Sequence, residues 1–526
     1  MSGIPTYSLT PIKRELKKED LLHLLRRTLF GVGNKELSFF KNKNILQSLD
    51  ILLKQSPEPH APLQEDSDVV DPLVPTGQTW INAPYENDLI ENRRGLMLKM
   101  WWTGQVINRD YSLTEKMTLF WHNHFVTEMD IVKDSRYSYR YIAMLRSHSL
   151  GNFKKLIREG TTNIAMLVYL NGNTNVKGEP NENYSRELME LFTLGKEHGV
   201  NYTEDDIKAA ARVLCGWKDD KETLQVKFHP SLHDSDDKKF SSFFDNHIIK
   251  GRTATEGSNE TDELIDMIFK KSETAKFVCR NLYRWFVSSH VDENIESRII
   301  EPLSKILINN NYEVVPVLRT LLSSEHFFNP VFRGCIVKNP VEFFIGAIQQ
   351  FDVVTTADLY KNHIPWLQFY FYTADLSMDI GNPPSVAGWA AYYQPPKFHQ
   401  WWVNSASLGL RTKILGDLST SEGLIFNGPY IKFDFPHFLR QFQNPDNPDK
   451  LIEDCTKLLC AVEISQTDTR NLKSILLSGQ QADHYWTDAW NEYVINSADM
   501  MTKSVIETRL QSFFLKLFKM PEYQMM

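Results

Sequence analysis

Apolar residues recur at helical spacing through most of this 526-residue chain, and this period constrains the fold more than any other feature. Leu21, Leu22, Leu25 and Leu29 form one apolar stripe, because residues three and four apart share a helical face. The same spacing returns over much of 86–214 and 262–414 and again near the end of the chain. We therefore predict an all-α fold with a large multi-helix body.

A period of two interrupts this pattern within residues 218–260. Leu224, Val226 and Phe228 alternate with polar residues, which predicts a short strand, and Ile248 with Ile249 offers a candidate partner strand. The sequence around them is polar. We expect a small β-containing insertion in the helical body.

Proline, glycine and acidic residues divide the chain into segments. In order, the segments are an N-terminal helical segment (1–55), an irregular acidic connection (56–85), a central helical core with the candidate site (86–217), the polar insertion (218–260), a second helical lobe with a Pro/Gly aromatic loop (261–415), a connection (416–450) and the C-terminal helices (451–526).

Composition excludes several classes of protein. Charged residues make up 24% and apolar residues 42%, as in soluble globular proteins, and the net charge of −8 gives no electrostatic case for a nucleic-acid partner. No apolar run approaches the length of a membrane span. No cleavable signal is evident, so we expect a cytoplasmic protein, or an extracytoplasmic one if a signal was removed. Five cysteines without a CxxC pair indicate buried free thiols.

Four motifs have a composition that bears on function. They are Phe120-Trp121-His122-Asn123-His124-Phe125; Asn181-Glu182-Asn183-Tyr184-Ser185-Arg186-Glu187-Leu188-Met189-Glu190-Leu191-Phe192 with Gly195; His233-Asp234 ahead of Lys238 and Phe240; and Gly381-Asn382-Pro383-Pro384-Ser385-Val386-Ala387-Gly388-Trp389 with Trp402-Val403-Asn404-Ser405-Ala406.

Together these motifs resemble the bacterial family known as domain of unknown function 1800. The similarity begins at Leu24-Leu25-Arg26-Arg27-Thr28, includes Lys338-Asn339-Pro340-Val341-Glu342, and ends at Pro521-Glu522-Tyr523-Gln524. The resemblance implies a large helical protein with no established activity. It also implies a partner, since members are often exported and encoded beside a secreted phosphatase- or sulfatase-like protein, although this sequence lacks an evident signal.

The spacing of Glu187 and Glu190 places two carboxylates on one helical face, where they repel unless a cation or a shared proton lies between them. His122 and His124 point about 200° apart on a helix, so only one of them can complete a site with the carboxylates. We predict a divalent metal held by Glu187, Glu190 and one of these histidines. The alternatives are that Arg186 neutralises Glu190, and that one histidine packs in the core with a backbone hydrogen bond while the other caps the helix or faces solvent.

The remaining candidates have catalytic or substrate-binding interpretations. Arg186 is predicted to steady an oxyanion, and His233, oriented by Asp234, to act as acid or base, with a solvated charge run as the alternative. Asn181 and Asn183 precede a helix and either bind substrate or cap that helix.

Trp389 and Asn404 belong to the aromatic Pro/Gly loop. They either contribute to a groove for a sugar ring or hold the loop against the core.

These residues predict a metal-assisted hydrolase or lyase that acts on a polymeric or envelope-related substrate. The rival hypothesis is a non-enzymatic scaffold or partner-binding protein that docks through the aromatic loop and the polar insertion. A third is an internal polar network that fixes helix register and needs no ligand.

Overall fold

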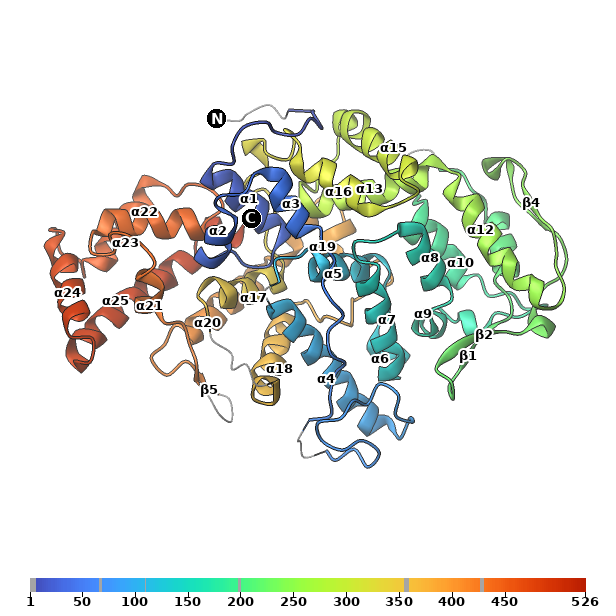
Figure 1. Ribbon diagram of the computed structural model, residues 1–526, viewed down its shortest axis with the longest axis horizontal. Coiled ribbons are helices and arrows are strands. Elements are labelled where there is room, and N and C mark those ends of the chain that lie inside the picture. The colour runs from blue at the N-terminus through green and yellow to red at the C-terminus, as the bar shows by residue number, and fades with distance from the viewer. Residues whose placement is uncertain (1–5, 66–68, 109, 197–199, 354–358, 426–429) are drawn as a thin grey trace.

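A computed structural model describes the chain except residues 1–5, 66–68, 109, 197–199, 354–358 and 426–429. Helices dominate the described part, which also contains three two-stranded antiparallel sheets. The predicted all-α class with a small β insertion is confirmed. Figure 1 shows an elongated molecule with the insertion at one end and the C-terminal helices at the other.

Three short helices begin the described chain: α1 (Lys18–Thr28), α2 (Asn34–Phe40) and α3 (Ile45–Leu52). The predicted stripe lies on α1, where Leu21, Leu22 and Leu25 are buried. Residues 56–85 contain no helix or strand in their described part, as their proline content predicts.

The central helices follow. They are α4 (Asp88–Ile107), α5 (Thr114–His124), α6 (Met129–Val132), α7 (Ser135–Ser147), α8 (Phe153–Thr161), α9 (Ile164–Tyr169), η1 (Gly172–Thr174), α10 (Asn183–Glu187), η2 (Leu188–Thr193) and α11 (Glu204–Val213). Helix α5 packs against α4 and α7 and is buried on nearly every side, which explains its density of apolar and aromatic residues. It therefore carries its histidines into the middle of the body.

The insertion contains two hairpins. Its elements are β1 (Trp217–Asp220), β2 (Gln225–Phe228), η3 (Pro230–Leu232), β3 (Lys238–Lys239), η4 (Ser242–Phe244), β4 (Ile248–Ile249) and η5 (Ala254–Ser258). The predicted pairing of 224–228 with Ile248–Ile249 is wrong, because β2 pairs with β1 and β4 pairs with β3. Leu224 has φ +54° and belongs to the turn that joins β1 to β2, not to a strand. Each strand of the insertion pairs with the strand next to it in the sequence, as short connections favour.

The second lobe is again helical. Its elements are α12 (Asn259–Phe269), α13 (Ser272–Phe286), α14 (Glu293–Ile295), η6 (Glu296–Ile300), α15 (Glu301–Asn309), α16 (Val314–Ser323), η7 (Pro330–Phe332), α17 (Pro340–Gln350), α18 (Leu359–Asp375), α19 (Ala390–Tyr393), η8 (Phe398–Trp402) and α20 (Ser405–Leu418). Helix α18 packs on α4, and α13 packs on η2 and α15, so this lobe closes over the central helices.

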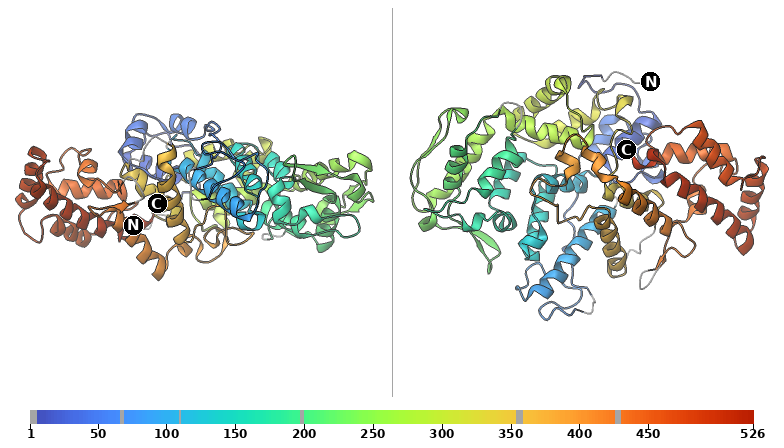
Figure 2. Two further views of the ribbon diagram at one scale, coloured as in Figure 1. Left: turned by 90° about the horizontal axis from the view of Figure 1, so that it is seen from below. Right: turned by 180° about the vertical axis from the view of Figure 1, so that it is seen from behind.

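The last elements form a lobe of their own. They are β5 (Leu424–Ile425), β6 (Tyr430–Ile431), α21 (Phe435–Leu439), α22 (Pro448–Leu459), α23 (Gln466–Leu476), α24 (His484–Ile495), α25 (Met500–Phe518) and α26 (Pro521–Gln524). Figures 1 and 2 show α22–α25 projecting from the body on the side away from the insertion. The chain then returns to the body, where Lys338 N–H donates to the Gln524 carbonyl (2.9 Å).

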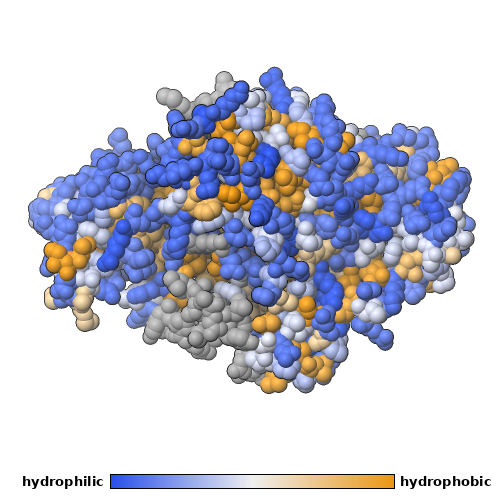
Figure 3. Space-filling view, in the orientation of Figure 1, coloured by the Kyte–Doolittle hydropathy of each residue, from blue (hydrophilic) through white to orange (hydrophobic). Residues whose placement is uncertain are grey.

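The surface bears on membrane association. Within the described residues, no helix combines the length and apolar character needed to cross a membrane. The face seen in Figure 3 is mainly hydrophilic and carries hydrophobic residues in separate patches.

Candidate functional site

Three of the four sequence motifs meet at one cavity of about 240 Å³. We call it the central cavity. Its lining includes Phe120, Asn123 and His124 from α5; Glu190, Leu191, Leu194, Gly195 and Lys196 from η2 and its C-terminal end; Phe277, Arg280, Asn281, Arg284 and Trp285 from α13; and Ala387, Tyr392 and Tyr393 from the Pro/Gly loop and α19. Residues far apart in the sequence thus share one site.

His124 is a buried side chain at this cavity. Its Nε2 lies 2.9 Å from the Phe192 carbonyl, which can only accept, so Nε2 carries the proton and Nδ1 the lone pair. The Asn281 amide donates to that Nδ1 at 3.4 Å. Burial lowers the pKa of His124 to about 4, so the ring is neutral at pH 7. The fold therefore presents a neutral imidazole in a fixed tautomer.

The side chain of His122 extends from a different face of α5 than that of His124. Its Nε2 accepts from Gly381 N–H (3.2 Å), and its ring packs edge-on against Trp102 and Trp389. Burial, together with the charge of Lys99, lowers the pKa of His122 to about 3. His122 does not line the central cavity, and its contacts hold the Pro/Gly loop on α5.

Of the two predicted carboxylate ligands, Glu187 and Glu190, only Glu190 lines the central cavity. Glu190 lines the cavity, and its carboxylate pairs with Lys196 Nζ (2.5 Å) and more distantly with Arg186 Nη1 (3.6 Å). Glu187 is half-buried outside the lining, and burial followed by the neighbouring charge of Glu190 raises its pKa. Glu187 therefore lies near Glu190 but outside the cavity that Glu190 lines.

Arg186 is occupied at the surface. Its guanidinium binds both carboxylate oxygens of Glu204 (2.7 and 2.9 Å) and one oxygen of Glu182 (3.1 Å). These contacts raise the pKa of Arg186 above its usual range. Arg186 does not line the central cavity, so the structure gives its predicted oxyanion role no cavity position.

The helix that carries Glu190 is a π-helix, in which hydrogen bonds run five residues back. It ends at Thr193, and Gly195 follows with φ +77°, where an added Cβ would lie 2.9 Å from the Phe277 ring. The last turn leaves the Phe192 carbonyl to accept from His124. Such π segments occur often at functional sites, and no composition signal in the sequence predicted this one.

Helix α13 supplies cavity residues that the sequence reasoning missed. Arg280 is buried and bound to Glu296 (2.7 and 2.9 Å) and Glu273 (3.2 Å), while Asn281 positions His124. Arg284 lies one turn further along the same face. The available signal was an i, i+4 spacing of polar residues among aromatic ones, which a solvated helix face also shows.

The Pro/Gly loop is fastened to α5. Trp389 is 2% exposed, and its N–H donates to Asn123 Oδ1 (2.9 Å). Gly388 has φ +87°, and a Cβ there would lie 2.6 Å from the Asn123 carbonyl oxygen. Trp389 thus wedges the loop against the core and does not offer a surface, whereas Tyr393 at the cavity is 44% exposed.

Of the asparagine candidates, Asn404 acts as a helix cap, whereas the N-cap of α10 is Glu182. Asn404 is the N-cap of α20 and accepts from the N–H groups of Ala406 and Ser407 (2.9 Å each). Asn181 accepts from Asn183 N–H (3.0 Å) at the entrance to α10. None of the three asparagines lines the central cavity.

His233 and Asp234 lie in a separate network within the insertion. His233 donates through Nδ1 to the Cys215 carbonyl (3.0 Å), and its Nε2 is 3.1 Å from Glu260 Oε1. Glu260 also binds Lys238 Nζ (2.5 Å), and Asp234 binds Arg212 Nε (2.7 Å). Burial raises the pKa of Glu260, but hydrogen bonds from His233 and Lys238 outweigh it and leave that pKa lowered. This closed arrangement agrees with the polar-network interpretation.

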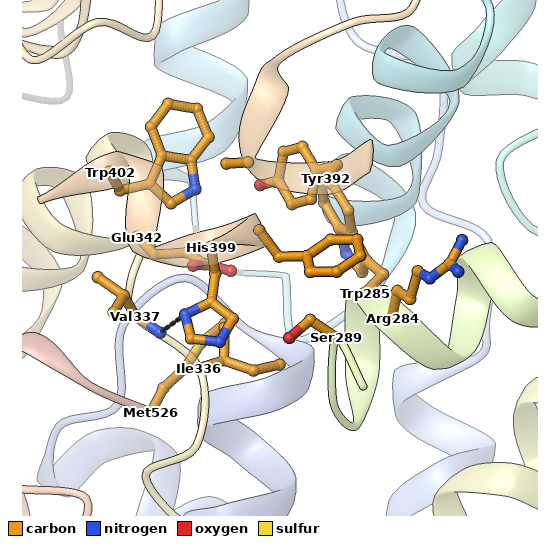
Figure 4. Close-up of a pocket in the computed structure, with 12 residues that line it drawn as sticks. Arg284, Trp285, Ser289, Ile336, Val337, Glu342, Tyr392, His399, Trp402 and Met526 are labelled. Atoms are coloured by element: carbon orange, nitrogen blue, oxygen red, sulfur yellow. Dashed lines mark hydrogen bonds between the residues drawn. The ribbon is translucent and has the colours of Figure 1, made fainter. Parts of the chain in front are cut away.

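A smaller cavity of about 20 Å³ shares Arg284, Trp285 and Tyr392 with the central cavity, and it has room for about one water molecule. Figure 4 shows its residues, with His399 Nδ1 accepting from Val337 N–H (3.1 Å) and Arg284 pointing away from His399. Trp285 and Tyr392 stack with centroids 4.4 Å apart. This ring pair lines both cavities.

Two of the four predicted metal ligands, His124 and Glu190, share the central cavity. Among the described residues, no three His, Cys, Asp or Glu side chains form a group that could hold a metal ion. His124 already uses Nε2 for the Phe192 carbonyl, so only Nδ1 could face an ion.

Comparison with known proteins gives a family and no activity. No curated protein and no solved structure matches the chain. One family model matches residues 23–524, a range that contains all four motifs. The chain belongs to the family described as Protein of unknown function (DUF1800).

Proposed function

We propose that this protein is a hydrolase or lyase that cleaves a polymeric, sugar-containing substrate in the central cavity. One observation carries the proposal: two groups that can transfer a proton, the neutral His124 and the carboxylate of Glu190, line the same cavity. General acid–base catalysis needs such groups within reach of one bound substrate.

The lining fits a sugar ring. Phe277, Trp285 and Tyr393 supply aromatic surface, and Asn123 supplies an amide. The volume of about 240 Å³ lies below the roughly 300 Å³ at which ligand pockets usually begin. A cavity of this size takes one ring of a polymer, and the exposed face of Tyr393 offers a stacking surface for it.

His124 has the chemical state of a base. Its Nδ1 lone pair is held toward Asn281, whose amide is 3.4 Å away, a weak hydrogen bond that substrate could replace. Phe192 fixes the ring through Nε2, so a proton taken at Nδ1 stays on an oriented imidazole. Glu190, paired with Lys196, is the second group available for proton transfer.

Cleavage assays test the proposal. The purified chain is incubated with uronic-acid polysaccharides and with neutral glucans, and new reducing ends are measured together with the ultraviolet absorbance of unsaturated products. Reducing ends alone indicate hydrolysis, and absorbance indicates elimination. His124→Gln and Glu190→Gln are each expected to slow cleavage about 10²–10⁴-fold.

Two comparisons make the result specific. His484→Gln, at an exposed position on α24, is the control and should cleave at the original rate. Glu187→Gln separates Glu190 acting alone from a carboxylate pair, which would lose activity with either substitution. Saturable polymer binding without cleavage would refute the enzyme and favour the partner-binding hypothesis.

A further inference from the structure

Several cations are buried near the contact between the N-terminal helix and the C-terminal lobe. Three motifs that the central cavity does not explain meet there, from α1, from the start of α17 and from α26. Their cations, with two from α5 and α20, are Arg26, Arg27, Lys116, Lys338 and Arg411, and four of these five are buried, with Arg26 partly exposed. A buried charge is costly unless an opposite charge lies nearby.

Only one of these cations has a carboxylate partner among the described residues. Lys116 pairs with Glu342 at 2.9 Å. Arg27 donates to the Phe332 carbonyl and Cys335 Sγ, and Lys338 donates to the Tyr523 carbonyl (2.7 Å).

Arg411 and Arg26 follow the same pattern. Arg411 donates to Gln524 Oε1 and the Lys338 carbonyl, and Arg26 donates to the carbonyls of Lys457 and Leu458 (3.2 and 2.9 Å). Neutral oxygens satisfy these hydrogen bonds but carry no net charge, and the nearby charge of Glu342 opposes the lowering that burial causes in the pKa of Lys338 and of Arg411.

Burial of these cations changes their pKa values. Burial, aided by the charge of Arg26, lowers the pKa of Lys338 to about 7. Burial also lowers the pKa of Arg26 and that of Arg411 to about 10 each. An added anion would relieve the same electrostatic strain.

A cleft of about 620 Å³ is lined by one of these five cations, Arg26. It lies between α1 and α22, which are neighbours in Figure 1. Its other cations are Lys18, Arg333 and Lys457, and its carboxylates are Glu19, Asp449, Glu453 and Glu463. Most of these charges have partners, since Glu453 pairs with Lys450 and Lys457, Asp449 with Lys473, and Arg333 with Asp20. Leu22, Ile452, Val462 and Ile464 supply its apolar lining. The volume is typical of a small-molecule site.

We propose that this cleft binds an amphipathic anion, a carboxylate or phosphate with an alkyl chain, whose head group pairs with Arg26. The charge supports an anion because Arg26 has hydrogen bonds but no carboxylate partner among the described residues. The lining supports an alkyl chain because apolar side chains continue from Arg26 along α22 and the segment after it. The site is separate from the central cavity and does not depend on the function proposed for it.

Fluorescence titration with cis-parinaric acid tests the site on the full chain. Dodecanoate and dodecyl phosphate should displace the probe, and dodecanol should be about tenfold weaker because it lacks the charge. Inorganic phosphate alone should not displace it, because it lacks the apolar part. A preference between dodecanoate and dodecyl phosphate would identify the head group.

Two variants with matched controls locate the binding. Arg26→Gln should weaken probe binding about tenfold or more, while Arg319→Gln, at a partly exposed ion pair with Asp50, should not. Arg26 also holds carbonyls of α22, so Val462→Trp tests the site independently by filling the cleft. Val494→Trp, at a position 52% exposed on α24, is its control.

Several results would overturn the proposal. They are the absence of saturable probe binding, equal displacement by dodecanol, displacement by inorganic phosphate as effective as by dodecyl phosphate, and unchanged binding in Val462→Trp. If Arg26→Gln does not fold, as judged by circular dichroism, the Val462→Trp result decides.

Discussion

His124 and His233 are both buried histidines, yet the protein uses them differently. His124 is neutral, hydrogen-bonded to an amide, and lies at a cavity. His233 lies between the Cys215 carbonyl and Glu260 in a network that Lys238 completes. In His124 the Nδ1 lone pair has only a weak hydrogen bond at the central cavity. In His233 both ring nitrogens contact other parts of the fold, the Cys215 carbonyl and Glu260.

The difference shows that motif composition does not distinguish a site from a structural network. Both histidines belong to motifs that suggested a functional site in the sequence. What separates them is the packing around each one: His124 contacts Phe192 and Asn281, 68 and 157 positions away, whereas His233 contacts the Cys215 carbonyl 18 positions away and Glu260. The following experiments would break or sharpen this comparison.

The largest effect is expected in the closed network. Glu260→Gln removes the only carboxylate facing both His233 and Lys238 among the described residues, and it should lower the free energy of unfolding by about 3–5 kcal/mol. Urea denaturation measures this loss. Glu263→Gln, at a partly exposed ion pair with Arg252, should cost below about 1 kcal/mol. Equal, small losses would show that the network around His233 is open to water.

The fastening of the Pro/Gly loop should show the next effect. Gly388→Ala adds a Cβ against Asn123 at φ +87° and should cost about 3 kcal/mol through strain and overlap. Gly178 has nearly the same φ, +89°, with nothing within 4 Å, so Gly178→Ala should cost only about 1 kcal/mol. Thermal or urea unfolding of both variants isolates the close approach. Equal costs would mean that the loop is not held tightly on α5.

The pH dependence of stability should separate His124 from solvent-exposed histidines. Because the pKa of His124 falls from 6.5 to about 4 on folding, the unfolded chain binds this proton first as the pH falls. The neutral state of His124 therefore costs the folded protein nothing above pH 6.5, and the free energy of unfolding decreases as the pH falls from 6.5 toward 4. Between pH 7 and pH 5 this decrease amounts to about 2 kcal/mol.

His124→Gln should flatten the pH dependence of the unfolding free energy by that amount, and His484→Gln should leave it unchanged. Urea denaturation at the two pH values measures both. An unchanged slope in His124→Gln would mean that water reaches the ring and that its neutral state is not fixed by the fold.

The sequence predicts the fold class well because helical periodicity is a local property. It places α1 from the Leu21, Leu22 and Leu25 stripe, and it identifies an insertion from the alternation at Val226 and Phe228. Strand pairing was harder to predict, since Leu224 fits the alternation but adopts a turn conformation. Backbone conformation at single residues is set by the turn they complete.

The candidate site was partly predictable. The motifs around His124 and Glu190 were singled out, but their meeting with Asn281 depends on a contact across 157 positions. The π-helix that turns Glu190 toward the cavity has no period of its own in the sequence. Asn404 and Trp389 both belong to the aromatic Pro/Gly loop in the sequence. Only the fold shows that Asn404 caps α20 and that Trp389 is buried.

Metal removal should have the smallest effect on stability. The central cavity offers two of the predicted ligands, His124 and Glu190, and a structural zinc site normally uses four. We expect a divalent ion to bind weakly there, so chelation should leave the melting temperature unchanged within about 1 °C, which is about the shift that 1 kcal/mol produces in a chain of this length. Elemental analysis before and after chelation, on protein supplemented with Mn²⁺ or Zn²⁺, measures the ion directly, and the Glu187→Gln/Glu190→Gln variant shows whether these carboxylates hold it.

Near-stoichiometric metal that survives chelation would contradict weak binding and would favour the metal-assisted reaction in the central cavity. Metal that is lost on chelation and absent in the variant would leave His124 and Glu190 as the acid–base pair, with the ion as an accessory to that pair.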